Sequence, residues 1–286
     1  MLAHQIETPV REVLYRTRGH TRGPITRLVS PSDLGELMKP FVFLDLAVFE
    51  GNERIPMDQL WHPHSGIATV TVILDGAVRV AETTGTDEVL PAGSIEWMRA
   101  GNGVWHTGQA QPGDVKVFQL WVALPPELEN GPSQSHYVMP DEVPTDGRVR
   151  VILGTYDGMT SPIAAPPMMT YLVVRLLDGE RWTFTPPKGH DVAWVAVGDG
   201  ALRTVRADIP SGEVAVFAKG SEPIDFIADG PTRFVLGSAR KHPHDLVLGY
   251  YSVHTSGEAL EEGETEIRRI GAELEANGTL RRRVRI

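Results

Sequence analysis

The feature that most constrains the fold of this 286-residue chain is a series of short apolar runs separated by glycine and proline. Runs of this length, rich in Val, Ile, Thr and Phe, are typical of β-strands. One stretch instead has helical character, from the capping pattern Thr255-Ser256-Gly257-Glu258 to Asn277-Gly278. The sequence therefore predicts an all-β fold with a C-terminal helix. The clearest apolar runs are 41–48, 67–74, 115–124, 171–177, 192–197 and 213–217, with another opening at Phe234.

The order of turn signals in the two halves of the chain indicates an internal repeat. Asp-Gly favours tight turns because glycine accepts positive φ without a steric penalty. Since such turns also recur by chance in all-β proteins, coincidence is the alternative to duplication. We expect two similar β units, residues 1–140 and 141–286, divided at the proline- and acid-rich stretch 139–144. The repeated turns are Asp75-Gly76-Ala77 with Pro91-Ala92-Gly93, and Asp199-Gly200-Ala201 with Pro210-Ser211-Gly212.

Three histidines in the first half have a spacing that suits a metal site. His62 and His64 are two residues apart, so in an extended segment their side chains leave on the same face. His106 follows a glycine-rich turn, and an antiparallel strand would bring it beside that pair. Three neutral imidazoles suit Fe(II), Zn, Cu, Ni or Mn and leave coordination positions open. Histidines that meet by accident of sequence are the alternative.

The repeat allows the same positions to be compared in the second half. Counted from the second Asp-Gly turn, the partners of His62 and His64 are Pro186 and Lys188, and the partner of His106 is Asp225. We therefore expect any metal in the first unit only.

A second His-x-His pair, His242 and His244, lies in the polar segment 239–245. We expect this pair to have a loop role, with an auxiliary metal site as the alternative. The isolated histidines His136, His190 and His254 are assigned no function.

Composition narrows the chemistry further. The chain has no cysteine, so any metal must be held by His, Asp or Glu. A net charge of −10 disfavours nucleic acid as a partner, because phosphate binding relies on Lys and Arg. We expect a cytoplasmic protein without a membrane segment, since no signal peptide or apolar run of about 20 residues is evident. The basic segment 281–286 is interpreted as a solvated tail.

Several segments resemble the pirin family of the cupin superfamily. The resemblance covers nearly all of the chain beyond about residue 15. It implies a bicupin, in which two cupin-type β-barrels (double-stranded β-helices) pack face to face and the N-terminal barrel holds one metal, usually iron. The segments are PFVFLD (40–45), WHPHSGIATVTVILDGAV (61–78), LPAGSIEWMRAGNGVWHTG (90–108), FQLWVALP (118–125), VRVILGTYDG (149–158) and LVLGYYSVHTSGEALEEGETEIRRIG (246–271).

The chain departs from the family pattern at the fourth metal ligand. The family ligands are His-x-His and a later His-x-Glu, and Gly108 stands where that glutamate is expected. Ala68 occupies the other position at which a glutamate is expected, and Ser65 replaces the usual arginine. Gln109 should point to the opposite face of its strand unless a bulge intervenes. We expect weaker metal binding without the carboxylate, and an empty structural barrel is the alternative.

The resemblance implies two classes of function. In the first, the chain is a dioxygenase acting on flavonols or catechols, in which a divalent metal, Fe(II) by preference, binds the substrate oxygen as Lewis acid or redox relay. In the second, it is a monomeric regulatory protein that binds a protein partner. No general base is assigned, because Gly108 replaces the family glutamate and nothing in the sequence directs Glu82 or Glu96 towards the site.

Overall fold

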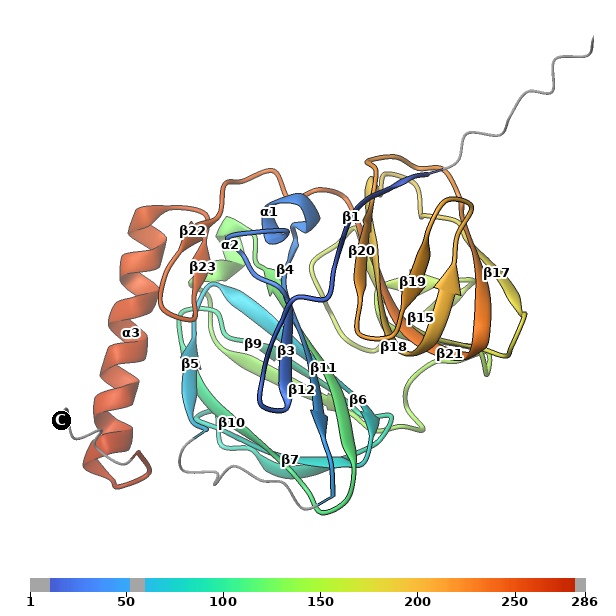
Figure 1. Ribbon diagram of the computed structural model, residues 1–286. Helices are drawn as coiled ribbons and strands as arrows, with labels where there is room; N and C mark the ends of the chain where they lie inside the picture. Colours follow the sequence, from blue (N-terminus) through green and yellow to red (C-terminus); the bar gives the residue numbers. More distant parts are fainter. Residues whose placement is uncertain (1–10, 52–59, 281–286) are drawn as a thin grey trace, which may run out of the picture.

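The computed structural model describes residues 11–51 and 60–280, which form mainly β-strands (Figure 1). In the first half, a seven-stranded sheet has the order β12-β9-β6-β11-β4-β3-β2, and a four-stranded sheet has the order β5-β10-β7-β8. Two short helices, α1 (Gly35–Met38) and α2 (Pro126–Glu129), lie in the connections. The strands are β2 (His20–Arg22), β3 (Ile25–Val29), β4 (Phe41–Phe49), β5 (His62–His64), β6 (Ile67–Asp75), β7 (Ala77–Glu82), β8 (Asp87–Pro91), β9 (Ile95–Arg99), β10 (Val104–Ala110), β11 (Val115–Ala123) and β12 (Gln134–Val138).

The second half is a barrel built on one eight-stranded sheet, with a main path β1-β20-β18-β21-β16-β13 and two side strands, β17 on β21 and β19 on β18. Two small hairpins, β14–β15 and β22–β23, accompany it. The elements are β1 (Val13–Thr17), β13 (Val149–Leu153), β14 (Thr155–Tyr156), β15 (Met159–Thr160), β16 (Met169–Leu176), β17 (Arg181–Phe184), β18 (Val192–Arg203), β19 (Asp208–Pro210), β20 (Val214–Phe217), β21 (Ile224–Ala239), β22 (Val247–Leu248), β23 (Val253–His254) and α3 (Gly257–Ala276).

Both ends of the chain pack against the half that is distant in sequence. Strand β1 pairs antiparallel with β20 of the second half. Helix α3, drawn in red, runs beside β5 and β10 of the first half (Figure 1). The division of the chain near residue 140 stays a prediction, but each half is closed by a segment from the opposite end.

The internal repeat is visible in the hydrogen bonds of its turns. In the first half the amide of Gly93 donates to the carbonyl of Ile73 at 2.7 Å, and in the second half the amide of Gly212 donates to Val197 at 2.8 Å. Both glycines have positive φ, 90° and 75°, as a turn of this kind requires. The two Pro-x-Gly turns therefore have the same glycine conformation and make the same kind of hydrogen bond to a preceding strand in each half.

The two Asp-Gly sites differ from the predicted pattern. Gly76, with a φ of 73°, joins β6 to β7 as a tight turn, as expected. Gly200 instead lies within the continuous strand β18, whose pairing with β21 shifts in register on either side of Asp199. The second site is therefore a bulge, because β21 carries its own bend at Gly230-Pro231 and the two long strands turn together.

Alternation along β6 separates two interiors. Because successive side chains of a strand point to opposite faces, one set joins the core shared between the two halves and the other faces into the first barrel. The shared set is Ala68, Val70, Val72 and Leu74, and the inner set is Ile67, Thr69, Thr71 and Ile73. The interior of the first barrel is thus partly polar.

The interior of the second barrel is filled by aromatic side chains. Ring centroids lie 5.8 Å apart in the pair Trp182–Phe226 and 5.7 Å apart in Phe226–Phe234. Phe184 and Phe217 belong to the same buried cluster. Within the part of the chain that the structure describes, this buried cluster is made of apolar side chains, and no group of three metal-ligating side chains lies in the second barrel.

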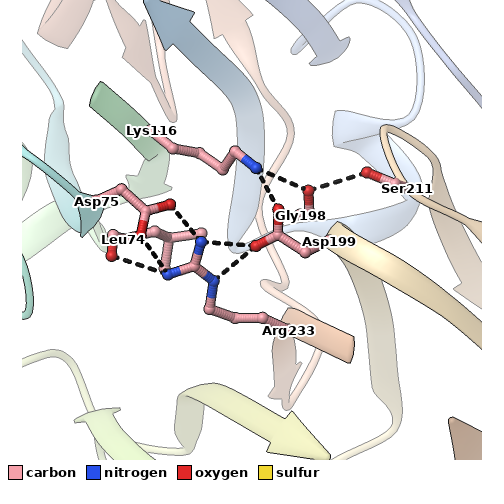
Figure 2. Close-up of polar contacts among 7 residues, drawn as sticks. All are labelled: Leu74, Asp75, Lys116, Gly198, Asp199, Ser211 and Arg233. Carbon is pink, nitrogen blue, oxygen red and sulfur yellow. Dashed lines mark hydrogen bonds and ion pairs between the residues drawn. The ribbon is translucent and has the colours of Figure 1, made fainter. Parts of the chain in front are cut away.

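The two halves are joined by an apolar core and by a polar clamp. Phe41 of the first half meets Trp194 of the second edge to face, with ring centroids 5.6 Å apart. Figure 2 shows the clamp, in which Arg233 of β21 bonds the carbonyl of Leu74 at 2.8 Å and the carboxylate of Asp75. Asp199 accepts from both Arg233 and Lys116, so one carboxylate links cations from each half.

The start of helix α3 confirms the predicted position but not the predicted capping box, because Ser256 and not Thr255 is the N-cap residue, which places Ala259 and not Glu258 three residues after it. The side chain of Ser256 accepts a hydrogen bond from the amide of Ala259 at 3.1 Å. Within residues 11–51 and 60–280, no helix is long and apolar enough to cross a membrane.

The clamp predicts a pH-dependent contribution of Asp199 to stability. Burial alone would raise the pKa of this carboxyl, but hydrogen bonds from Lys116 and Arg233 outweigh it and hold the pKa below its ordinary value. A depressed folded-state pKa stabilises the protein above the unfolded pKa, and the effect disappears as pH falls through the folded value. We expect Asp199→Asn to cost about 1 kcal/mol at pH 7 and progressively less below pH 4.

Thermal unfolding of the wild type and Asp199→Asn between pH 3 and pH 7 measures this effect. Asp229→Asn, which changes an exposed carboxylate on β21, the strand that carries Arg233, is the matched control. A difference between wild type and Asp199→Asn that stays constant over this pH range would contradict the role of the charge.

Candidate metal centre

The three histidines identified from the sequence lie together in the first barrel. His62 and His64 are the two ends of β5, so their side chains leave the strand on one face. His106 lies on β10, directly opposite His62 in the antiparallel pairing. The short strand and its register therefore bring the predicted residues into one cluster.

Their Nε2 atoms converge on one point. Nε2 of His106 lies 2.9 Å from Nε2 of His62 and 3.1 Å from Nε2 of His64. His64 and His106 are buried, and His62 is half-buried. Among the described residues, these are the histidines and acids that group closely enough to hold a metal ion.

The outer nitrogens of two of these rings are fixed by backbone carbonyls. Nδ1 of His62 lies 2.7 Å from the carbonyl oxygen of Leu60, and Nδ1 of His64 lies 3.0 Å from that of Tyr251. A carbonyl oxygen only accepts, so each Nδ1 carries the proton and each Nε2 presents a lone pair inwards. This is the outer hydrogen bond that metal-binding histidines usually make.

Burial keeps these imidazoles neutral. Burial, followed by the neighbouring His106, lowers the pKa of His62 to about 3. The pKa of His64 is also well below its ordinary value, first through burial and then through His62 and His106. The Nε2 lone pairs of His62 and His64 therefore both face Nε2 of His106. That nitrogen carries at most one proton, so it can donate a hydrogen bond to only one of the two lone pairs at a time. A cation at this point would satisfy all three nitrogens, so the donor set fits a metal.

Two buried carboxylates lie inside the same barrel. Glu96 is 2% exposed and Glu82 is 5% exposed. An oxygen of Glu96 lies 3.9 Å from Nδ1 of His106, on the side of the ring away from the cluster. Glu96 also accepts a hydrogen bond from Thr71 at 2.5 Å.

Glu82 is bonded by hydroxyl groups of β12. Ser135 donates to it at 2.6 Å, and the phenol of Tyr137 donates to its other oxygen. The pKa of Tyr137 is raised by burial, by the charge of Glu96 and by the bond to Glu82, so the phenol keeps its proton. Within the described part of the chain, neither Glu82 nor Glu96 has a Lys or Arg within ion-pair distance. Buried charges are normally paired or bound to metals, so these anions also favour a cation nearby.

The position of Gly108 is open. It lies two residues after His106 on β10 and has a backbone that any residue can adopt. A Cβ built there would meet one atom within 4 Å, Cγ1 of Val78 at 3.6 Å. Ala68, the other position considered for a carboxylate, is in the core shared by the two halves.

Aromatic rings surround the cluster. The ring of Trp121 lies 4.9 Å from His64 and stacks on Phe43 at 4.0 Å. The ring of Tyr251 lies 5.4 Å from His62 and is 41% exposed. His62 and Tyr251 are the more exposed of these rings, and the buried Trp121 lies beside Tyr251 with ring centroids 6.4 Å apart.

The second His-x-His pair differs from the first. His242 and His244 are in a loop, as predicted, with ring centroids 5.3 Å apart, and they do not join a group of three ligands among the described residues. His242 is nevertheless buried, and burial followed by the neighbouring His244 and Lys39 lowers its pKa to about 4.

Sequence reasoning missed the importance of His254 and Tyr251. His254, assigned no function above, is buried and lies 3.0 Å from the hydroxyl of Ser65, beside the ligand pair. The family resemblance marked Ser65 as a departure, which was the available signal that its surroundings had changed. The basic segment 281–286 lies outside the described residues.

Comparison with known proteins agrees with this fold. The Pirin family model matches residues 23–122. A "Pirin-like protein" of Caulobacter vibrioides is 33% identical over 214 residues, which are 68% of this chain and 75% of the relative. A Pseudomonas aeruginosa protein named "Putative quercetin 2,3-dioxygenase" is 28% identical over 75% of this chain and 86% of its own length.

Solved structures share the architecture. Quercetin 2,3-dioxygenase from Acinetobacter baumannii superimposes with a TM-score of 0.79 at 22% identity, covering 91% of this chain and 98% of that one. The Escherichia coli pirin YhhW, solved in complex with nickel(II), gives a TM-score of 0.62 at 18% identity, covering 81% and 98%. These likenesses describe the fold as two cupin-type barrels with a C-terminal helix. Together with the Caulobacter relative, they establish that the chain belongs to the pirin family.

Proposed function

We propose that His62, His64 and His106 hold one divalent transition metal, and that the protein is a dioxygenase for planar aromatic substrates of the flavonol or catechol type. The observation that carries the proposal is the convergence of three imidazole nitrogens in a buried site. The outer nitrogens of His62 and His64 are bonded to backbone carbonyls, so the inward lone pairs of these two rings are already oriented. The enzyme names among its relatives support the reaction class.

Iron(II) is the metal we propose. Three imidazoles suit Fe(II), Ni, Zn, Cu or Mn, and they leave positions open for ligands from outside the protein. When bound, such a metal supplies Lewis acidity to a substrate hydroxyl and redox coupling to dioxygen.

The residues of this chain would bind and orient the substrate. Tyr251 and His62 form the approach to the cluster, and the exposed phenol ring of Tyr251 offers a flat face to an aromatic ligand. Trp121 stacks on Phe43 and lies beside Tyr251, with ring centroids 6.4 Å apart, so it adds a second, buried aromatic surface next to the cluster.

Glu96 and Glu82 would balance charge from outside the first coordination shell. Three neutral imidazoles leave a divalent cation with charge +2, and two carboxylates in the same barrel offset it. Glu96 acts on the metal through His106, because its oxygen faces Nδ1 and not the inward Nε2. For the same reason it is not placed to take a proton from a substrate at the open side.

One observation favours a second candidate, a non-enzymatic regulatory protein that binds a protein partner. At Gly108 there is no side chain to act as proton acceptor on the open side of the cluster. Oxygen consumption separates the two candidates, because a regulator would bind metal without consuming oxygen.

The first prediction concerns metal content and activity together. Loaded with Fe(II) under anaerobic conditions, the protein should hold about one metal per chain and then consume oxygen when given quercetin or a related catechol. His62→Ala and His106→Ala should each retain less than about a tenth of a metal. His242→Ala and His244→Ala are the controls and should bind as the wild type does.

Elemental analysis and an oxygen electrode measure these outcomes. Bound metal without oxygen consumption above buffer would exclude the dioxygenase for these substrates and favour the regulator. Metal retained by His106→Ala, but lost from His242→Ala, would move the site to the second pair.

The second prediction uses the open position at Gly108. Gly108→Glu places a carboxylate two residues after His106, where the Cβ meets only Val78 at contact distance. We expect metal binding to tighten about tenfold or more, equivalent to about 1.4 kcal/mol. Gly108→Gln has the same size without the charge and should tighten binding far less. Equal affinities for the two variants, measured by competition with a chelator, would argue against a ligand at this position.

The third prediction concerns Glu96. In the metal-free protein this carboxylate is a buried charge without a cationic side-chain partner among the described residues, so Glu96→Gln should stabilise that form by about 1 kcal/mol. The same change removes a charge that offsets the metal, so metal affinity should fall by about tenfold. Thermal unfolding without metal and chelator competition measure the two effects. Loss of metal-free stability with unchanged affinity would contradict both.

A further inference from the structure

A continuous chain of buried polar side chains lies directly beside His64. The hydroxyl of Ser65 donates to Ser252 Oγ at 2.8 Å, and the hydroxyl of Ser252 donates to the carbonyl of Tyr250 at 3.0 Å. Nε2 of His254 lies 3.0 Å from Ser65 Oγ, and its Nδ1 lies 3.5 Å from a carboxylate oxygen of Glu129. Ser65, Ser252, His254 and Glu129 are all at most 3% exposed.

This chain has the composition of a Ser–His–Glu catalytic triad, but its hydrogen bonds run the wrong way for one. Ser65 gives its proton to Ser252, so Nε2 of His254 donates to Ser65 and cannot accept a proton from it. The serine is also fully covered, since a Cβ on Gly263 of α3 would lie 2.6 Å from Ser65 Oγ. The arrangement is therefore structural and not catalytic, and we call Ser65, Ser252 and His254 the lock because their hydrogen bonds hold the C-terminal segment against β5.

Glu129 ties the lock to the start of helix α3. Its two oxygens accept hydrogen bonds from the amide of Thr255 at 2.6 Å and from the hydroxyl of Thr255 at 2.7 Å. The helix is held separately on β10, where the indole nitrogen of Trp105 donates to the carbonyl of Ile267 at 2.8 Å. Figure 1 shows α3 and the β22–β23 hairpin beside β5. The C-terminal segment is thus fastened to the strand that carries the first two ligands.

Tyr251 lies between Tyr250 and Ser252, two residues whose positions are fixed by hydrogen bonds. Its neighbour Ser252 is bonded to Ser65, and the carbonyl of Tyr250 accepts from Ser252. Tyr251 itself has a φ of 55°, a left-handed conformation that costs free energy for any residue other than glycine. Strain of this kind persists when the surroundings impose it, and it tends to mark functional sites. In this conformation its carbonyl oxygen meets Nδ1 of His64 at 3.0 Å.

We propose that Tyr251 is a positioning residue of the metal centre, and that the Ser65–Ser252–His254 lock holds its carbonyl in place to orient His64. The inference rests on the proposed metal function of the three histidines. His64 and Tyr251 are 187 positions apart in sequence, so the C-terminal hairpin completes a site whose ligands all come from the first barrel. The carbonyl selects the tautomer of His64 in which Nε2 is free to bind a metal.

Ser252→Ala tests the proposal, because it removes both hydrogen bonds of Ser252 without adding bulk. The probe is Co(II), whose visible absorption reports the geometry of its ligands. We expect Co(II) to bind at least tenfold more weakly and its absorption bands to shift. The matched control is Ser238→Ala, which removes a buried serine that lies 3.2 Å from Nδ1 of a buried histidine, His190, in the second barrel. That variant should bind Co(II) with the affinity and spectrum of the wild type.

A pair of variants at His254 separates positioning from general damage. His254→Gln keeps an N–H that can donate to Ser65 and should retain most of the Co(II) affinity, whereas His254→Leu should lose it. Circular dichroism confirms that each variant is folded. If Ser252→Ala does not fold, the tautomer of His64 in the wild type, read by nitrogen NMR, still decides: a proton on Nε2 would overturn the proposal.

The outcomes distinguish this inference from the function on which it rests. A wild type that binds no Co(II) would remove the metal function itself. A wild type that binds Co(II), with Ser252→Ala and His254→Leu unchanged in affinity and spectrum, would overturn the role of the lock alone.

Discussion

The convergence of three imidazole nitrogens on one point is the constraint around which the first barrel is organised. Nitrogens 2.9 and 3.1 Å apart, with their protons directed outwards, repel one another unless a cation or a shared proton lies between them. Rings in this arrangement must be held against that repulsion. The carbonyls of Leu60 and Tyr251 do so for two of them. A single shared proton can relieve one of these two contacts, whereas a cation between the rings would satisfy all three nitrogens at once.

The two barrels have equivalent turns but different interiors, one apolar and one partly polar. Equivalent turn hydrogen bonds at Gly93 and Gly212 indicate a common plan. The interior of the second barrel is filled by stacked and tilted aromatic rings, which stabilise by burial of apolar surface. The first barrel gives up part of that apolar filling for Thr71, Glu82 and Glu96. Thr71, Ser135 and Tyr137 satisfy these carboxylates by hydrogen bonds, and because buried carboxylates are normally paired with cations or bound to metals, the polar interior supports the proposed metal site.

The sequence predicted those features that depend on spacing within a strand or between adjacent strands. His62 and His64 are two apart, and His106 comes from the next strand in the same sheet, so periodicity and pairing were enough. The contribution of Tyr251 and His254 could not be predicted in this way, because it depends on where the chain returns after the second barrel. Glu96 could be named as a candidate from the sequence, but its position beside His106 could not be predicted. That position depends on the pairing of β9 with β6 and on the curvature of the barrel. The bulge at Gly200 was predicted as a turn because Asp-Gly looks the same in both settings, and only the matching bend of β21 distinguishes them.

Fastening the C-terminal segment to β5 has a physical consequence for the site. A strand of three residues has few hydrogen bonds of its own, and among the described strands of its sheet β5 pairs with β10 alone. The bridge between Ser65 and Ser252 and the packing of α3 supply the order that the short strand lacks. Because the proposed ligands His62 and His64 lie on this strand, the geometry of the three-histidine cluster depends on residues 247–280 as well as on the barrel. A site built this way can be altered by changes in the C-terminal segment that touch neither metal nor substrate, since they act on the orientation of His64 alone.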